Sequence, residues 1–288
     1  MFKCCVLIVS ICLLCTGLHA AETRYAGIFY QPLARDIGAS SEDWGNLLWS
    51  VKADGINHIV FQWSQFGEQS FVGRDSTIER VLSQLEIRNM GFTLGLAMPA
   101  NYYHVMEHSD AQTKQIALQK WLQQNVQFML RMTVAGFPQR QGFQGWYLPL
   151  EISETYVDGE LLAIWQNGLA HLLRETPYNV SVSYFPSANG EFNRFAQIND
   201  ALAHPRLTLM VQIPSGVSDT DVRSSIIQLP CKAAVVVENF TQTSAIGQPF
   251  TADKAALPTL ASQYDCQKAY IFSLRYQAYS HFLPLQDF

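Results

Sequence analysis

Two glutamates stand where apolar stretches end. Glu151 follows residues 143–150 and Glu238 follows residues 233–237, and both stretches have the composition of buried strands. A pair of carboxyl groups facing one pocket can hydrolyse a glycosidic bond: one protonates the leaving oxygen while the other attacks the anomeric carbon or activates water. One such Glu alone is more often solvated or ion-paired. Glu154 competes for the acid role but belongs to the following loop, so the pair Glu151 and Glu238 is the prediction.

Amides, aromatic rings and one arginine also gather at the ends of the predicted strands. Amide groups bind sugar hydroxyls, and aromatic faces stack on the C–H faces of sugars. Trp63, at the end of its strand, is the residue we expect to form a sugar platform. The full set of predicted substrate-binding residues is Tyr30, Gln31, Gln62, Trp63, Asn101, Tyr102, Tyr147, Tyr184, Gln212, Asn239, Arg275 and Tyr276.

A competing motif runs from His104 to His108. The order His-x-x-Glu-His occurs in one group of zinc proteases, where both histidines bind the metal from one face of a helix. The motif precedes Ser109 and Asp110, which resemble the cap of the next helix, and we find no third ligand downstream. The sequence therefore predicts a loop over the pocket, with neither metal nor cofactor. A serine nucleophile elbow of the type Gly-x-Ser-x-Gly is absent from the sequence.

The elements that position these residues alternate between strand and helix. Predicted strands cover 24–30, 57–63, 92–98, 143–150, 180–185, 207–213, 233–237 and 269–274, and predicted helices cover 43–52, 77–89, 111–133, 160–174, 191–203, 219–228 and 254–263. Eight strands with a helix after each of the first seven predict a (β/α)₈ barrel, in which the carboxyl ends of all strands meet at one mouth. A doubly wound open sheet is the alternative, but the sequence has no Gly-rich phosphate loop.

Tryptophan and histidine positions elsewhere fit packing rather than chemistry. Trp44, Trp49, Trp121 and Trp165 lie within predicted helices and are expected to pack between the helices and the barrel. His58 and His171 are expected in the core or on the surface.

Three motifs resemble a known family. They are GIFYQP (Gly27 to Pro32), GINHIVFQW (Gly55 to Trp63) and GWYLPLEI (Gly145 to Ile152). They look like a bacterial family of unknown function that is generally described as glycosyl-hydrolase-like. The placement of the two glutamates also resembles the clan of retaining glycoside hydrolases with (β/α)₈ folds.

The resemblance implies roles for the two carboxyl groups. By analogy with the clan, Glu151 would be the acid/base and Glu238 the nucleophile. Two positions depart from the clan's pattern, because Leu150 stands where Asn is common and Gln212 stands where an aromatic hydroxyl often supports the nucleophile.

The composition disfavours one class of partner, and the N-terminus predicts export. The 288 residues are 48% hydrophobic and carry a formal charge of −5, which disfavours a nucleic-acid partner. Lys3 precedes a charge-free run over 4–18, shorter than the roughly 20 residues of a membrane span. We expect residues 1–20 to be a signal peptide, with a retained anchor as the alternative, and 21–288 to form one periplasmic or secreted barrel without a membrane span.

Two cysteines remain after cleavage of that segment. Cys231 and Cys266 precede the seventh and eighth predicted strands, whose starts lie side by side in a barrel. In an exported protein this predicts a disulfide, with two buried thiols as the alternative.

Three functions stay open. One is a metallohydrolase that uses His104 and His108. The second is an exported glycoside hydrolase acting on a polysaccharide or oligosaccharide. The third is a non-catalytic carbohydrate-binding barrel, or an accessory protein of exopolysaccharide secretion, which needs the aromatic mouth but no carboxylate pair.

Overall fold

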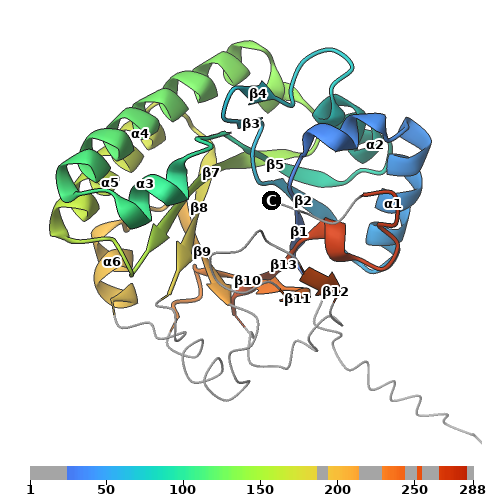
Figure 1. The fold of residues 1–288 in the computed structure, drawn as a ribbon. Coiled ribbons are helices and arrows are strands. Elements are labelled where there is room, and N and C mark those ends of the chain that lie inside the picture. The colour runs from blue at the N-terminus through green and yellow to red at the C-terminus, as the bar shows by residue number, and fades with distance from the viewer. Residues whose placement is uncertain (1–24, 187–193, 214–228, 244–251, 255–265, 284–288) are drawn as a thin grey trace, which may run out of the picture.

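Eight parallel strands close into a barrel in the computed structural model, which describes residues 25–186, 194–213, 229–243, 252–254 and 266–283 (Figure 1). The strands follow one another around the barrel in the order β1-β13-β10-β9-β8-β7-β5-β2. Their bounds are β1 Gly27–Tyr30, β2 His58–Phe61, β5 Gly91–Gly95, β7 Phe143–Ser153, β8 Asn179–Phe185, β9 Leu207–Ile213, β10 Ala234–Glu238 and β13 Lys268–Phe272. The barrel predicted from the strand and helix pattern is therefore confirmed, and the open sheet is excluded.

Helices cover the outside of the barrel. They are α1 Ser41–Ala53, α2 Thr77–Ile87, α3 Tyr102–His108, α4 Ala111–Val134, α5 Gly159–Arg174 and α6 Phe195–Ala201, with short 3-10 turns η1 Ala34–Gly38, η2 Phe137–Gln139 and η4 Leu274–Tyr276. The helix predicted over 191–203 is shorter than expected. The helix predicted over 219–228 lies outside the described residues, as does nearly all of 254–263, whose first residue instead ends a strand.

Two small sheets beside the mouth were not predicted. β3 Gln65–Phe66, β4 Gln69–Ser70 and β6 Ala97–Met98 form one, and β11 Phe240–Gln242 pairs with β12 Ala252–Lys254 in the other. The strand predicted over 92–98 is thus divided between the barrel and a sheet at its rim. Asn125 of α4 fixes that sheet, because its buried amide accepts from Ala97 N at 2.8 Å and donates to Ala97 O at 3.0 Å.

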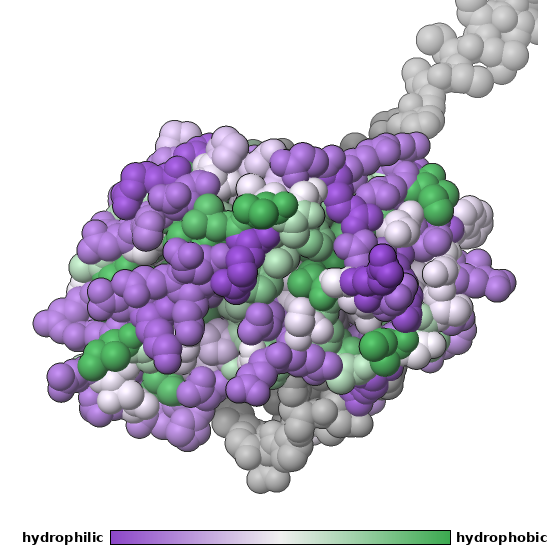
Figure 2. All heavy atoms as spheres, turned by 90° about the horizontal axis from the view of Figure 1, so that it is seen from above, coloured by the Kyte–Doolittle hydropathy of each residue, from purple (hydrophilic) through white to green (hydrophobic). Residues whose placement is uncertain are grey.

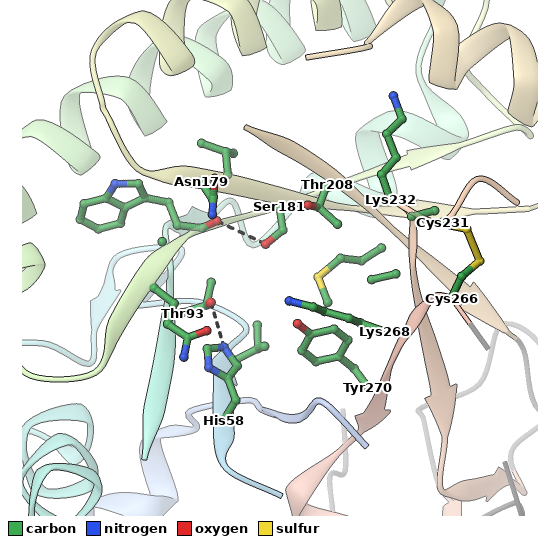
Figure 3. Close-up of a pocket in the computed structure, with 18 residues that line it drawn as sticks. His58, Thr93, Asn179, Ser181, Thr208, Cys231, Lys232, Cys266, Lys268 and Tyr270 are labelled. Carbon is green, nitrogen blue, oxygen red and sulfur yellow. Dashed lines mark hydrogen bonds between the residues drawn. A yellow bond between two sulfur atoms is a disulfide. The ribbon is translucent and has the colours of Figure 1, made fainter. Parts of the chain in front are cut away.

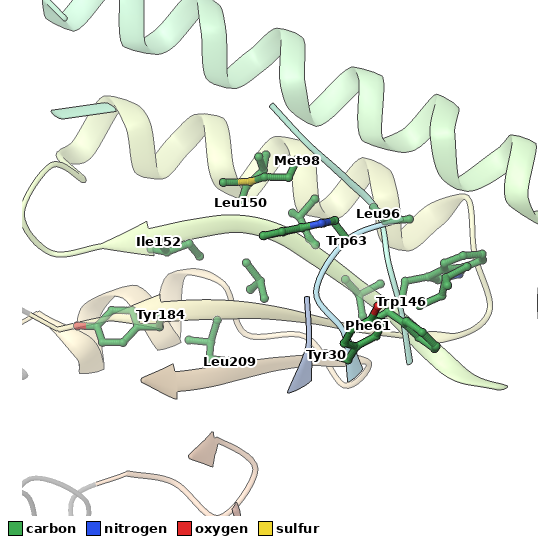
Figure 4. Packing of buried hydrophobic residues seen from close by; sticks show 14 of the residues in the cluster. Tyr30, Phe61, Trp63, Leu96, Met98, Trp146, Leu150, Ile152, Tyr184 and Leu209 are labelled. Carbon is green, nitrogen blue, oxygen red and sulfur yellow. The ribbon is translucent and has the colours of Figure 1, made fainter. Parts of the chain in front are cut away.

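Side chains alternate between two apolar regions. The larger core lies between the barrel and its helices, and Figure 4 shows part of it around β7 and β8. A smaller cluster fills the inside of the barrel and consists of Phe29, Val60, Tyr147, Met210, Ala234 and Val236. Neighbouring residues of a strand point to opposite faces. On each strand, the residues two and four positions after one of these six therefore also face inward.

Three of the four tryptophans pack as expected. Trp44 and Trp165 are fully buried and Trp121 is nearly so. The expectation for Trp49 was wrong, since this side chain is 67% exposed on α1. Its position in the helix was correct, but it lies on the face turned away from the barrel.

The predicted disulfide is present. Cys231 and Cys266 are bonded, with their Cα atoms 4.9 Å apart, and they precede the adjacent strands β10 and β13. None of the helices in the described ranges is both long enough and apolar enough to cross a bilayer.

Candidate active site

Five polar side chains reach the mouth of the barrel from five strands. Each stands an even number of residues beyond an inward-facing apolar residue, so the alternation points it inward at the carboxyl end of the barrel. They are Gln31 after β1, Gln62 after β2, Glu151 on β7, Gln212 on β9 and Glu238 on β10. Both predicted carboxyl groups thus belong to one ring of residues.

Glu151 lies within β7, at an irregularity of the strand. Leu148 pairs with Val182 and Ile152 pairs with Tyr184, so β7 uses two more residues than β8 over this stretch. Pro149 lies in the irregularity and has no N–H to give to a neighbouring strand. The carbonyl of Glu151 accepts instead from two tyrosine hydroxyls.

Those two hydroxyls hold the backbone that carries the acid. Tyr102 of α3 donates to Glu151 O at 2.5 Å, and Tyr156 donates to the same oxygen at 2.8 Å. Tyr102 is fully buried, so it does not bind substrate as predicted; it is a positioning residue for Glu151. The sequence did not single out Tyr156, which lies beyond the strand with no pattern to mark it.

Burial changes the acidity of Glu151. Its pKa is raised from 4.5 to about 7, mainly by desolvation and secondly by the negative charge of Glu238. Hydrogen bonding from Tyr103 and Gln212 acts in the opposite direction. A carboxyl group with such a pKa is substantially protonated near neutral pH and faces a second carboxylate, which is the division of roles that acid-assisted bond cleavage needs.

Helix α3 extends over the mouth beside Glu151. The sequence predicted a loop over the mouth for the His104–His108 segment. The segment does lie at the mouth, but it is a helix. Glu107 lies near enough to raise the pKa of Glu151 slightly, and Tyr103 reaches the carboxyl group itself. The two histidine rings lie 5.4 Å apart, but nowhere in the described ranges do three or more His, Cys, Asp or Glu gather as a metal would require.

Tyr30 and Arg275 belong to a buried network outside the barrel. The Arg275 guanidinium forms an ion pair with Asp36 at 2.7 and 3.0 Å, and Tyr30 donates to the same carboxylate at 2.9 Å. All three side chains are essentially inaccessible to solvent. Tyr30 has the opposite orientation to Gln31, so it packs on Trp44 of α1 and not at the mouth. Both residues stabilise the fold, and the prediction that they bind substrate was wrong.

Trp63 and Tyr184 are also part of the packing core (Figure 4). Trp63 is 3% exposed, donates to Pro32 O at 2.9 Å and packs on Phe66, so neither ring face is open to a sugar. Tyr184 faces outward from β8 and donates to Glu154. Because Glu154 also accepts from Arg194 N at 2.9 Å, it is held in this network away from the acid position.

The remaining predicted residues lie at varying distances from the pair. Tyr147 is buried inside the barrel below Glu151, and its hydroxyl bonds to Ser183 at 2.7 Å. Asn239 is buried and donates to Ser273 O at 3.1 Å. Tyr276 packs on Phe240 beside the β11–β12 sheet. Asn101 is exposed and lines a groove between α4 and β6 with a volume of about 710 Å³.

The face of the molecule above α4 is mostly hydrophilic. Figure 2 shows it from above, with a group of hydrophobic residues in the middle of the polar surface. The groove that contains Asn101 is lined by Met98 and Phe128 together with several glutamines. It is separate from the ring of five polar side chains inside the barrel.

The chain resembles other proteins over nearly its whole length. An uncharacterised Escherichia coli protein, YbcH, is 24% identical over 283 residues, covering 88% of this chain and 91% of its own. A crystal structure of a candidate α-L-fucosidase from Bacteroides thetaiotaomicron superposes with a TM-score of 0.67 at 15% identity, covering 91% of this chain and 90% of that one. An endo-1,4-β-mannanase from Rhizomucor miehei gives a TM-score of 0.50 at 12% identity over 87% and 85% of the two chains.

The two solved structures support the barrel fold of this chain. The model of the domain of unknown function DUF4434 matches residues 25–275, which span every strand of the barrel. The chain therefore belongs to the DUF4434 family.

Proposed function

We propose that this protein is an exported glycoside hydrolase in which Glu151 is the acid/base and Glu238 the nucleophile. The observation that carries the proposal is the buried carboxyl group of Glu151, whose pKa is raised to about 7 beside a second carboxyl group at the mouth of the barrel. A glycosidase needs one carboxyl group protonated and one ionised at the same pH. Glu151 is buried whereas Glu238 is only partly buried, which favours the proton on Glu151.

The reaction would proceed in two steps. Protonated Glu151 gives its proton to the glycosidic oxygen while Glu238 attacks the anomeric carbon, which releases the leaving sugar and forms a glycosyl ester. Ionised Glu151 then takes a proton from water as that water attacks the same carbon, which frees Glu238. The two displacements together retain the anomeric configuration, and they need the carboxyl groups about 5–5.5 Å apart.

Sugar hydroxyls would meet amide groups in the mouth. The amide oxygens of Gln31 and Gln62 are buried and have no hydrogen-bond partner among the described residues. An unpaired buried acceptor is costly unless a water or a ligand donor satisfies it. Two such acceptors beside the carboxyl pair support a polyhydroxylated ligand.

Two further observations support the proposal. The fucosidase-like and mannanase structures share the barrel fold, although identities of 15% and 12% speak only for the fold. Export rests on the N-terminal segment 1–20, which lies outside the described residues, and on the disulfide, which persists in oxidising compartments.

The first experiment measures hydrolysis of an oligosaccharide and aryl-glycoside panel by the wild-type protein and by Glu151→Gln and Glu238→Gln. Each substitution should lower kcat at least 10²-fold, because it removes a proton donor or a nucleophile while keeping the shape of the side chain. Glu154→Gln is the matched control, being a nearby Glu held away from the pair, and should stay within about threefold of wild type by the same reasoning. Equal turnover by all four proteins would remove the pair from the mechanism.

A second experiment separates the two roles. Glu151→Ala should release dinitrophenol from a dinitrophenyl glycoside in a fast burst, because that leaving group needs no proton, and should then turn over slowly, because the base of the second step is missing. On an unactivated glycoside it should lose both steps. Glu238→Ala should lose both activities and recover turnover with azide, giving a glycosyl azide of inverted configuration. Saturable sugar binding without turnover on any substrate, unchanged in the Glu variants, would instead identify a non-catalytic carbohydrate-binding barrel.

A further inference from the structure

A cavity opens at the end of the barrel opposite Glu151 and Glu238. It has a volume of about 260 Å³ and is lined by the first residues of the strands, far along each strand from Glu151 and Glu238. Figure 3 shows its side chains, and all of its lining residues lie in described parts of the chain. Because the inner apolar cluster fills the barrel between the two ends, this cavity is separate from the proposed active site.

Hydroxyl and amide groups line the cavity. Thr93, Ser181 and Thr208 are inward-facing residues of three different strands, and the Tyr270 hydroxyl lies opposite them (Figure 3). Ser181 donates weakly to Trp146 O at 3.3 Å. The cavity thus offers several hydroxyl donors beside the apolar cluster that fills the middle of the barrel.

A buried histidine adds an unused polar atom. His58 is 6% exposed and its Nε2 atom bonds to Thr93 Oγ1 at 2.9 Å, while its Nδ1 atom has no partner among the described residues. Burial, followed by the positive charge of Lys268, lowers the pKa of His58 to about 4. The imidazole is therefore neutral at neutral pH. With its proton on Nε2 it donates to Thr93 Oγ1, which leaves the Thr93 hydroxyl proton for a ligand.

Two lysines line the cavity, and only Lys268 extends into it. In Figure 3 the Lys268 side chain extends among the hydroxyl groups, while the neighbouring Lys232 points away from them. No aspartate or glutamate is among the described residues that line the cavity. An ammonium group with hydroxyl donors and without a nearby carboxylate provides a preference for negative charge.

We propose that this cavity binds a small oxyanion, a phosphate or a carboxylate of similar size. Lys268 supplies the opposite charge, and the hydroxyls of Thr93, Ser181, Thr208 and Tyr270 donate to the anion's oxygens. The volume accommodates such an anion with a few waters but not an oligosaccharide. The site is independent of the proposed hydrolase activity.

The disulfide belongs to this site. Cys231 and Cys266 both line the cavity, and Cys266 stands two residues before Lys268. Their bond ties the start of β13 to the start of β10 and so limits where the Lys268 backbone can move. We therefore expect the oxidised protein to bind the anion more tightly than the reduced one.

The test is titration of the full-length mature protein with inorganic phosphate and, separately, with malonate, followed by calorimetry and by thermal unfolding at constant ionic strength. Saturable binding of either anion, absent with chloride, is expected, and the two titrations distinguish phosphate from carboxylate. Lys268→Gln should weaken binding at least tenfold. The matched control Lys232→Gln, on the adjacent strand but pointing away, should change it less than threefold.

Two further variants complete the experiment. Thr208→Val removes one donor at nearly constant volume and should weaken binding severalfold, and the double variant Cys231→Ser with Cys266→Ser should weaken it while the protein remains folded by circular dichroism. Glu151→Gln should bind the anion as wild type does, whether or not the protein hydrolyses sugars. Failure of both anions to saturate, or equal losses in the two lysine variants, would overturn the proposal.

Discussion

Replacing Glu151 by Gln should stabilise the protein at alkaline pH even though it removes the proposed catalytic acid. Desolvation, with the charge of Glu238, holds the folded-state pKa at about 7 against 4.5 in an exposed chain. This difference of about 2.5 pH units corresponds to roughly 3 kcal/mol, at about 1.4 kcal/mol for each unit. Glu151 is only 9% exposed, so solvent screening reduces this value little.

The direction of the effect follows from which state binds the proton. Below about pH 4.5 the carboxyl group is protonated in both states, and the burial of its charge costs nothing. As the pH rises from 4.5 to 7, the unfolded chain loses the proton first, so the wild-type protein is progressively destabilised. Above pH 7 the full cost of about 3 kcal/mol is present. Gln has no charge to bury and its side-chain oxygen can still accept from Gln212.

Urea unfolding of both proteins between pH 4.5 and pH 8 measures this difference directly. The two free energies of unfolding should nearly coincide at pH 4.5, and Glu151→Gln should be more stable by about 2–3 kcal/mol at pH 8, by the same linkage. Glu154→Gln serves as control, because it makes the same change at a nearby Glu that Tyr184 and Arg194 hold away from the pair. Parallel stability profiles for wild type and Glu151→Gln would refute the assignment of a raised pKa, and with it the proposed acid.

Three other perturbations test the surrounding structure. Arg275→Met should destabilise the fold by about 3–5 kcal/mol in urea unfolding, since it leaves a fully buried carboxylate without its ion pair. Removing the disulfide between Cys231 and Cys266, which closes a loop of 35 residues, should cost about 3–4 kcal/mol in the same assay. Tyr103→Phe should raise the pKa of Glu151, because it removes a hydrogen bond that lowers it, and so move the alkaline limb of the pH–activity profile upward; an unchanged limb would contradict that contact.

The order of strands and helices could be predicted from the chain because parallel barrel strands are buried on both faces and read as apolar runs. The same property hides orientation within a strand. Tyr30 and Gln31 both stand at the end of β1, but only Gln31 continues the inward series that begins at Phe29. Where every residue of a run is apolar, no polar alternation shows which face is which, so Tyr30, Trp63 and Tyr184 were assigned to the mouth although they face the helices.

Contacts between distant segments were the other part that the sequence could not provide. Asp36 lies in a short turn without a motif, and only the fold brings it to Arg275, 239 positions later. Pro149 was the one local signal of the irregular strand, because a residue without an N–H within a barrel strand interrupts the pairing. Even that signal did not indicate that α3 would supply hydroxyls to the interrupted strand.

The irregularity in β7 links the insertion after β6 to the chemistry proposed for Glu151. A regular strand would use the Glu151 carbonyl to pair with β8, and the acid would then be positioned by the barrel alone. Instead Tyr102 and Tyr156 bind that carbonyl, and Tyr103, one residue along α3, influences the carboxyl group. The place and the acidity of this group therefore depend on a helix that is not part of the eightfold repeat. Barrels of the same fold that lack this helix would need another way to hold an acid here, so likeness of fold alone does not imply likeness of mechanism.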